Sequence, residues 1–358
     1  MNTRLERLGR FLPADDTAAL ITAKHHIDYL TGFPSGDSHL LVTREKSYFL
    51  TDFRYIELAK QRVTGAECRM VSRIGEAICE IAQHHGLQRI LLEASRTTLS
   101  AAERWRMQVA DITFDGSGEL DGWLSDMRAI KDEYEVSKIL QAQALAEEGF
   151  EYILEHIREG MTEREIALEL EFFIRKRGAQ RAAFQFIVVS GANSSLPHGI
   201  PTDKPVQRGD FLTMDFGAVV DGYHSDMTRT VAVGAVSDEQ RHVYETVLNA
   251  QLATLGVLQD GLPCVEADAA ARRVIENAGY GECFGHATGH GVGMQVHEEP
   301  RLSAAAGDAR LKAGNVVTVE PGIYLEGRFG VRIEDMALIE RGGCRNLTKS
   351  PKELLLIK

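Results

Sequence analysis

Five residues in the second half of the chain carry side chains that bind divalent cations: four carboxylates and one imidazole. All five occur in apolar, glycine-rich segments that are typical of buried strands. An ionised carboxylate is costly to bury unless something pairs with it. Two divalent cations would balance the four carboxylates, and a hydroxide bridging them would be a nucleophile at neutral pH. The five residues are Asp215, Asp226, His290, Glu320 and Glu334.

The segment FLTMDFGAVVDGYHSDMTRTVAVG is typical of a β-hairpin with Asp221-Gly222 as its two-residue turn. That register places Asp215 opposite Thr228 and makes Asp226 the diagonal neighbour of Asp215 on the same face. Diagonal Cβ atoms lie about 7–8 Å apart, and oxygen-bridged metal ions lie about 3.5–4 Å apart. The two aspartates could therefore hold a metal pair, although each alone is also compatible with an ordinary strand or turn residue.

Glu320 and Glu334 form a second candidate pair on either side of LEGRFG. A loop centred on Gly327 would bring them face to face, although Pro321-Gly322 could disturb this register. The alternative is a pair of solvated glutamates at a sheet edge. The apolar residues that precede each glutamate favour a buried pair instead.

His290 lies in GHATGHGVGMQVHEEPR, where glycines permit a close approach of the backbone to a ligand. A phosphate-binding loop is the alternative interpretation of GHGVG. It lacks the Lys-Ser/Thr pair and the helix that should follow. Further candidate histidines are His198, in SSLPHG, and His286 and His297, in the same segment as His290.

The chain divides near residue 125. We expect residues 1–124 to form a small α/β domain, because short apolar runs alternate with helical patterns. A glycine-rich, acidic stretch over residues 113–135 is expected to be a connection. The predicted strands are 18–22, 39–43, 47–51 and 89–94, and the predicted helices are 54–63 and 74–86.

Residues 125–358 are expected to form an α+β domain with helices on one side of a mostly antiparallel sheet. Thr162, with Glu165 three residues later, predicts the start of one helix, and Gly178 predicts its end. The four predicted helices cover residues 131–160, 161–178, 237–255 and 265–279.

The composition narrows the choice of partners and compartment. The formal net charge of −12 argues against nucleic acid and anionic membrane surfaces, which favour basic proteins. The five cysteines include no C-x-x-C pair, which fits reduced thiols and a cytoplasmic location. The N-terminal residues lack the apolar region of a signal peptide, and no run approaches a membrane span of roughly 20 apolar residues.

Oxygen-rich ligands with one imidazole favour Mn²⁺, with Co²⁺, Fe²⁺ and Zn²⁺ as alternatives.

Four motifs resemble those of the pita-bread metallopeptidases, especially the proline-specific branch of Xaa-Pro aminopeptidases and prolidases. They are MDFGAVVDGYHSDMTRT, GHATGHGVGMQVHEEP, TVEPGIY and GVRIED. The resemblance is strongest over residues 125–358 and extends, less specifically, to ITAKHHIDYLTGF and YFLTDFRY. It implies a creatinase-like N-terminal α/β domain followed by a catalytic pita-bread domain with two divalent metal ions.

The resemblance also implies roles for the candidate ligands. Asp215 would bind one metal ion, and Asp226 and Glu334 would bridge both. His290 and Glu320 would complete the two coordination shells. Glu320 would also act as the general base or proton shuttle.

Four further positions match residues around the metal centre of the family, and a fifth, Thr228, is diagonal to the ligand Asp226 in the predicted hairpin. His198 and His297 would line the substrate pocket and stabilise the tetrahedral intermediate or the leaving group. Arg332 and Thr228 would support the ligand carboxylates. Arg301 matches an arginine that in prolidases could pair with the carboxylate of a dipeptide. The alternative for Arg301 is a surface residue.

The resulting expectation is a cytoplasmic, homodimeric metallo-exopeptidase that hydrolyses Xaa-Pro bonds with a metal-bridging hydroxide. Its substrates would be small peptides with proline at the second position. The sequence leaves open whether it is a dipeptidase or an aminopeptidase. The alternatives are a non-catalytic pita-bread binding protein and a methionine aminopeptidase-like enzyme.

Overall fold

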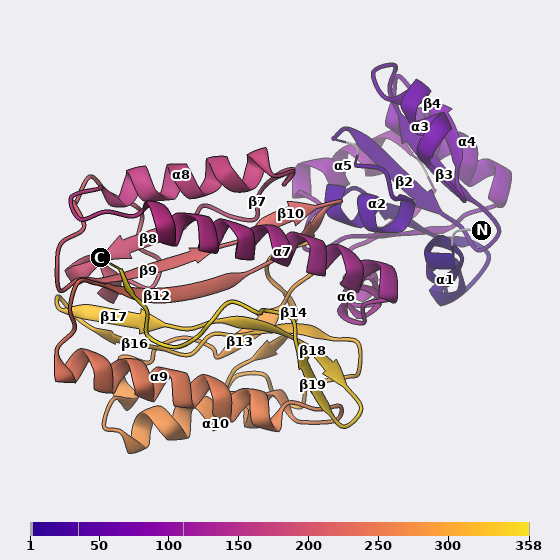
Figure 1. The fold of residues 1–358 in the computed structure, drawn as a ribbon. Helices are drawn as coiled ribbons and strands as arrows, with labels where there is room; N and C mark the ends of the chain where they lie inside the picture. The colour runs from indigo at the N-terminus through magenta and orange to yellow at the C-terminus, as the bar shows by residue number, and fades with distance from the viewer. Residues whose placement is uncertain (1–2, 35, 110, 358) are drawn as a thin grey trace. The chain divides into compact units, whose positions relative to one another are not determined.

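The chain forms two compact units in the computed structural model (Figure 1). The structure describes residues 3–34, 36–109 and 111–357. The two compact units are Met1–Arg128 and Ala129–Lys358. Each unit has a hydrophobic core of its own.

The first unit is built on a mixed six-stranded sheet with the order β4-β3-β2-β1-β5-β6. Antiparallel pairs join β1 to β2 and β2 to β3, whereas the other neighbours are parallel. The four predicted strands and two predicted helices are confirmed. The strands are β1 (Thr17–Ile21), β2 (Ser38–Val42), β3 (Ser47–Thr51), β4 (Glu67–Met70), β5 (Arg89–Leu92) and β6 (Thr113–Asp115). The helices are α1 (Thr3–Phe11), α2 (Lys24–Thr31), α3 (Ile56–Arg62), α4 (Ile74–His85), α5 (Leu99–Gln108) and α6 (Glu119–Ala129).

Helix α6 corrects the prediction that residues 113–135 are only a connection. Leu120, Leu124 and Met127 are buried on this helix. Their spacing of four and three residues gives one apolar face. The glycines and acidic residues of the segment hid this short amphipathic pattern.

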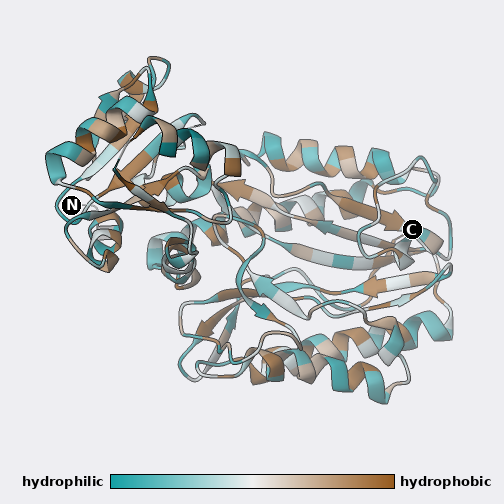
Figure 2. Ribbon diagram, turned by 180° about the vertical axis from the view of Figure 1, so that it is seen from behind, coloured by the Kyte–Doolittle hydropathy of each residue, from teal (hydrophilic) through white to brown (hydrophobic). Residues whose placement is uncertain are grey.

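The second unit has four long helices that carry alternating hydrophobic and hydrophilic residues (Figure 2), as expected of helices that cover a sheet. Capping boxes begin three of them, with Asp132, Thr162 and Ser237 as the N-caps. The helices lie in two pairs on opposite outer sides of the strands (Figure 1), so they do not form one layer. They are α7 (Glu133–His156), α8 (Glu163–Lys176), α9 (Asp238–Val257) and α10 (Cys264–Asn277).

The strands of the second unit form four small sheets that are mostly antiparallel. Their orders are β11-β10-β7, β20-β12-β9-β8, β14-β13-β15-β18-β19 and β16-β17. The first three strands are β7 (Arg181–Ala182), β8 (Ile187–Ser190) and β9 (Phe211–Phe216); then come β10 (Ala218–Val220), β11 (Tyr223–His224) and β12 (Met227–Val233). The others are β13 (Gly289–Gly291), β14 (Glu298–Leu302), β15 (Val316–Val319), β16 (Gly322–Leu325), β17 (Phe329–Arg332), β18 (Asp335–Glu340), β19 (Gly343–Asn346) and β20 (Leu356–Ile357).

The predicted hairpin and its register are confirmed. Asp221 and Gly222 both have positive φ, 49° and 83°, as a two-residue turn of this kind requires. Thr228 is the register partner of Asp215. In the described part of the chain, no helix is both long and apolar enough to cross a membrane.

Candidate metal and active site

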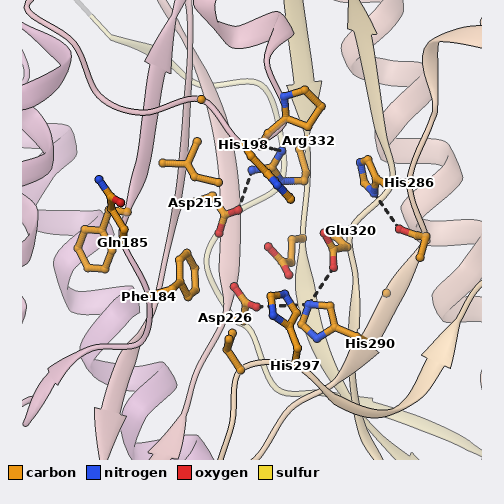
Figure 3. Close-up of a pocket in the computed structure, with 18 of the residues that line it drawn as sticks. Phe184, Gln185, His198, Asp215, Asp226, His286, His290, His297, Glu320 and Arg332 are labelled. Atoms are coloured by element: carbon orange, nitrogen blue, oxygen red, sulfur yellow. Dashed lines mark hydrogen bonds and ion pairs between the residues drawn. The ribbon is translucent and has the colours of Figure 1, made fainter. Parts of the chain in front are cut away.

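All five predicted ligands line one pocket of ≈ 670 Å³ in the second unit (Figure 3). Acidic, basic and apolar side chains all line the pocket. Phe184 and Gln185 lie on the side away from His286 and Glu320 (Figure 3). The apolar lining residues are Phe184, Phe186, Ile187, Pro197, Ile200 and Val296.

The β9–β12 hairpin supplies the first pair of carboxylates. Asp215 lies within β9, and Asp226 directly precedes β12. Both residues are buried, and Oδ1 of each has no hydrogen-bond partner among the described residues. Buried carboxylate oxygens without donors are costly, so these two atoms fit a site that receives a cation.

The second pair arises where two strand pairings meet. Glu320 follows β15, and Glu334 follows β17. Val319 pairs with Asp335 on one side of them, and Gly322 pairs with Arg332 on the other. Both pairings belong to one hairpin register, which places the two glutamates opposite each other. The predicted register is thus maintained past Pro321.

His290 joins the two pairs. It lies in β13, and its Nε2 is 3.2 Å from Glu320 Oε1 and 3.7 Å from Asp226 Oδ2. One ligand atom each from Asp226, His290 and Glu334 lies within 4.8 Å of the others. Asp215 and Glu320 line the same pocket but are not part of this group of three. Asp215 contacts Arg332, and Glu320 contacts His290.

The acidic groups strongly perturb one another. Burial raises the pKa of Asp226 well above its ordinary value, and the charge of Asp215 raises it further. Burial likewise raises the pKa of Glu334, to which Asp226 adds. Burial favours the neutral form of Glu320 too, but the hydrogen bond to His290 and the charges of His290, His286 and Arg332 together outweigh it and lower the pKa of Glu320 to about 2. Burial lowers the pKa of His290, yet the bond to Glu320 and the negative charges of Glu320 and Asp226 together prevail and raise it to about 9.

Arg332 and Thr228 connect ligands from the two hairpins. Arg332 Nη2 donates to Asp215 Oδ2 at 2.7 Å, and Arg332 Nε donates to Thr228 Oγ1 at 3.0 Å. Thr228 Oγ1 in turn donates to Glu334 Oε2 at 2.6 Å. The ligand carboxylate that Thr228 supports is therefore that of Glu334. These bonds fix the orientation of two carboxylates, as outer partners do in metal sites.

The predicted substrate-contacting residues lie at the same pocket. His198, His297 and Arg301 all line it and are exposed. The rings of His297 and His290 are 4.3 Å apart. Arg301 is the register partner of His290 across the β13–β14 pair. The structure thus brings together every site residue that the sequence singled out.

The sequence interpretation assigned no role to the contacts that His286 and Arg332, which line the pocket, make with Tyr324. His286 Nε2 lies 2.9 Å from the Tyr324 hydroxyl, and Arg332 Nη1 donates to that hydroxyl at 2.9 Å. This arrangement links His286 to the arginine that holds Asp215. The His-x-x-x-His spacing of 286 and 290, and the tyrosine that ends EPGIY, were the available signals.

Glu163 anchors the loop that carries His198, a role that no sequence pattern predicted. Its carboxylate is fully buried at the start of α8. It accepts hydrogen bonds from both the N–H and the hydroxyl of Ser190 and of Thr202, and from the Asn193 amide. These partners lie on both sides of His198 along the chain. The loop is therefore fastened at both ends to one carboxylate.

The comparisons with known proteins agree with this site. Residues 137–341 match metallopeptidase family M24, and residues 4–130 match the creatinase/prolidase N-terminal domain. An Xaa-Pro dipeptidase of Pyrococcus horikoshii is 34% identical over 359 residues, which cover 99% of each chain.

Two solved structures are similar over almost the whole chain. An Xaa-Pro dipeptidase from Bacillus anthracis is 39% identical, with a TM-score of 0.94 and 99% of each chain covered. An X-Pro aminopeptidase from Thermotoga maritima MSB8 is 38% identical, with a TM-score of 0.92, and the match covers 98% of this chain and 100% of that one.

The chain belongs to metallopeptidase family M24. It is a peptidase with a creatinase-type N-terminal domain and a pita-bread domain, and the expected fold class is confirmed. The non-catalytic alternative is therefore set aside. Membership of this family implies divalent metal ions, and the buried donor set described above fits them.

Gly289→Ala should weaken metal binding, because Gly289 precedes His290 at a very close approach of two strands. An added Cβ would lie 2.0 Å from the Thr318 carbonyl oxygen, which would force β13 and β15 apart. We expect the Mn²⁺ affinity to fall by roughly tenfold or more in a calorimetric titration. Gly285→Ala is the matched control, since its Cβ would meet nothing within 4 Å. Equal Mn²⁺ affinities for the two variants would contradict this account.

Glu163→Ala should destabilise the loop around His198. It would leave several buried donors without an acceptor, so we expect the free energy of unfolding to fall by on the order of 3 kcal/mol. Urea denaturation measures this loss. The control is Asp203→Ala, which removes only an exposed ion pair with Arg164 and should change little. Similar midpoints for the two variants would show that the buried carboxylate does not secure the loop.

Proposed function

We propose that the chain is a dinuclear exopeptidase that cleaves the bond before proline in small peptides. One observation carries this proposal. Four carboxylates and one histidine converge on a single pocket, where two aspartate oxygens lack any donor among the described residues. A single divalent cation would leave a surplus of two negative charges, whereas two cations would balance all four carboxylates.

The proposed ligand assignment follows the positions of the side chains. Asp226 and Glu334 would each bind both cations, as the resemblance to the family implies; with His290 they supply ligand atoms that lie within 4.8 Å of one another. Asp215 would bind one cation through the oxygen that Arg332 does not hold. His290 and Glu320 would complete the set. Mn²⁺ suits these ligands best, and Co²⁺, Fe²⁺ and Zn²⁺ are alternatives.

The bound cations would supply Lewis acidity that polarises the scissile carbonyl and lowers the pKa of a water molecule. Glu320 would accept a proton from the attacking water on its carboxylate and deliver it to the departing proline nitrogen. The water oxygen would first bond to the carbonyl carbon, and the C–N bond would then break as the proline nitrogen takes up the proton from Glu320. His198 and His297, at the pocket edge, would stabilise the negative oxygen and the leaving group.

Proline fits the pocket for two reasons. An Xaa-Pro bond has no N–H, so a protease that aligns its substrate through that group cannot use it. A site that acts on the carbonyl and the free amine does not need the N–H. The apolar lining residues, among them Phe184, Ile187 and Ile200, would offer contact surface to the pyrrolidine ring and to its neighbouring side chain.

Arg301 favours a dipeptide as the substrate. Arg301 is exposed, lines the pocket and is the cross-strand neighbour of His290. There it would pair with the carboxylate of a C-terminal proline. In a longer peptide this carboxylate is replaced by an amide, so the pair would be lost. The similar solved structures include one named as an Xaa-Pro dipeptidase and one named as an X-Pro aminopeptidase.

The proposal is tested with metal-loaded protein and three substrates: Ala-Pro, Ala-Pro-Ala and Ala-Ala. We expect cleavage of the two Xaa-Pro bonds and little cleavage of Ala-Ala. Arg301→Ala should raise KM for Ala-Pro by roughly tenfold or more, since it removes a charge-assisted pair of about 1.5–3 kcal/mol. KM for Ala-Pro-Ala should change much less.

Arg310→Ala serves as the control in this assay, because Arg310 is exposed and its guanidinium bonds Gly261 O outside the pocket. Equal effects of Arg301→Ala on the two proline substrates would contradict the role in dipeptide selection. Absence of proline-bond cleavage by folded, metal-loaded protein would contradict the proposed function itself.

A further inference from the structure

The loop of residues 292–297 determines where the His297 ring lies. It connects β13, which carries the proposed metal ligand His290 and ends at Gly291, to β14, which begins at Glu298. The rings of His297 and His290 are 4.3 Å apart. Among the described residues, no side chain or backbone group forms a hydrogen bond with the His297 ring. The place of this ring at the pocket therefore depends on the backbone of the loop.

The carboxylate of Glu298 closes this loop. Its Oε1 accepts a hydrogen bond from Gln295 N at 2.9 Å. Gln295 O in turn accepts a hydrogen bond from Gly293 N at 3.0 Å. An added Cβ at Gly293 would lie 2.7 Å from Glu298 Oε2, so the carboxylate lies directly against the loop backbone. The loop that ends in His297 is thus fastened by the side chain of the next residue.

Lys131, near the start of the second unit, holds the other oxygen of this carboxylate. Its Nζ lies 3.3 Å from Glu298 Oε2, and the two side chains are only 1% and 4% exposed. The backbone of Lys131 is itself fixed, because its N–H donates to Gly314 O at 2.8 Å. A buried ion pair adds little net stability, since removing two charges from water costs about as much as their attraction returns. The geometry that the pair imposes explains it better than the stability that it adds.

We infer that the Lys131–Glu298 pair positions His297 for the peptidase reaction, an inference that rests on the proposed function. Glu298 is not among the described residues that line the metal pocket, so it acts through the loop and does not touch the substrate. His297 would stabilise the negative oxygen and the leaving group. Loss of the pair should therefore slow the chemical step more than it weakens substrate binding.

A double-mutant cycle of Glu298→Gln with His297→Ala tests this coupling. The glutamine oxygen can still accept from Gln295 N, but the amide NH₂ then faces the ammonium of Lys131, so the side chain cannot satisfy both partners. We expect kcat for Ala-Pro to fall by roughly tenfold with little change in KM, because a small displacement of a reacting group slows the chemistry. In the His297→Ala background, Glu298→Gln should change kcat by less than about twofold, because the group through which it acts is absent.

Two further variants separate positioning from a general loss of stability. Gly293→Ala should lower kcat in the same way and with the same dependence on His297, because its Cβ would push the Glu298 carboxylate aside. Glu299→Gln is the matched control. It makes the same chemical change at the next residue, which is exposed, and it should leave kcat unchanged.

The position of the His297 ring can also be measured without catalysis. In NMR spectra of Zn²⁺-loaded protein labelled at histidine, the His297 ring signal is the one that His297→Ala removes. Glu298→Gln should shift or broaden this signal, and Glu299→Gln should not. The signal of His156, an exposed residue at the end of α7, should stay in place in both variants.

Three results would overturn the inference. They are an unchanged kcat in Glu298→Gln, an equal fall in kcat with and without the His297 ring, and a His297 ring signal that Glu298→Gln leaves in place. Failure of the parent to cleave either proline substrate would instead overturn the proposed function. In that case the ring signal still decides whether the ion pair positions His297.

Discussion

The repulsion among four carboxylates in one pocket is the constraint on which the second unit depends. Removing a carboxylate from water disfavours its charged form, and a neighbouring negative charge adds to that cost. The raised pKa values of Asp226 and Glu334 express this conflict directly. Cations relieve it, and they compete with protons for the same oxygens. Metal binding to this site is therefore coupled to proton release.

The fold holds the repelling groups together from outside the pocket. Arg332 and Thr228 fasten ligands of both hairpins to each other. Behind them, the fully buried Arg229 donates to the carbonyl of Glu334 and to the carboxylate of Asp335. The same guanidinium also bonds the carbonyls of Ser350 and Pro351. The ligand strands are thus tied to the C-terminal segment, so the geometry of the site relies on distant parts of the chain.

Much of the site was predictable because its registers are determined by local turn chemistry. Asp221-Gly222 specifies the turn that places Asp215 opposite Thr228, and Gly327, with φ of 69°, specifies the loop that opposes Glu320 and Glu334. A two-residue turn permits few registers, and a buried face permits only one of them. The side chains therefore follow from the sequence pattern.

The unpredicted parts depend on contacts between distant residues. Glu163 accepts a hydrogen bond from Thr202, which lies 39 residues further along the chain. No sequence periodicity predicts a carboxylate that accepts hydrogen bonds from a distant loop. The contact between His286 and Tyr324 likewise needs the folded sheet. Helix α6 was missed for a different reason, because its apolar face is short and its other positions are typical of a linker. The pairing of helices on two sides of the strands is equally a tertiary property.

The number of Mn²⁺ ions bound at saturation is the most direct measure of the central claim. Equilibrium dialysis of the metal-free protein, followed by elemental analysis, should give two ions per chain, because two divalent charges balance four carboxylates. Asp226→Asn, which removes one proposed bridging carboxylate, should lower that number under the same conditions. Saturation at a single ion per chain, or no saturable binding by the folded protein, would contradict the account.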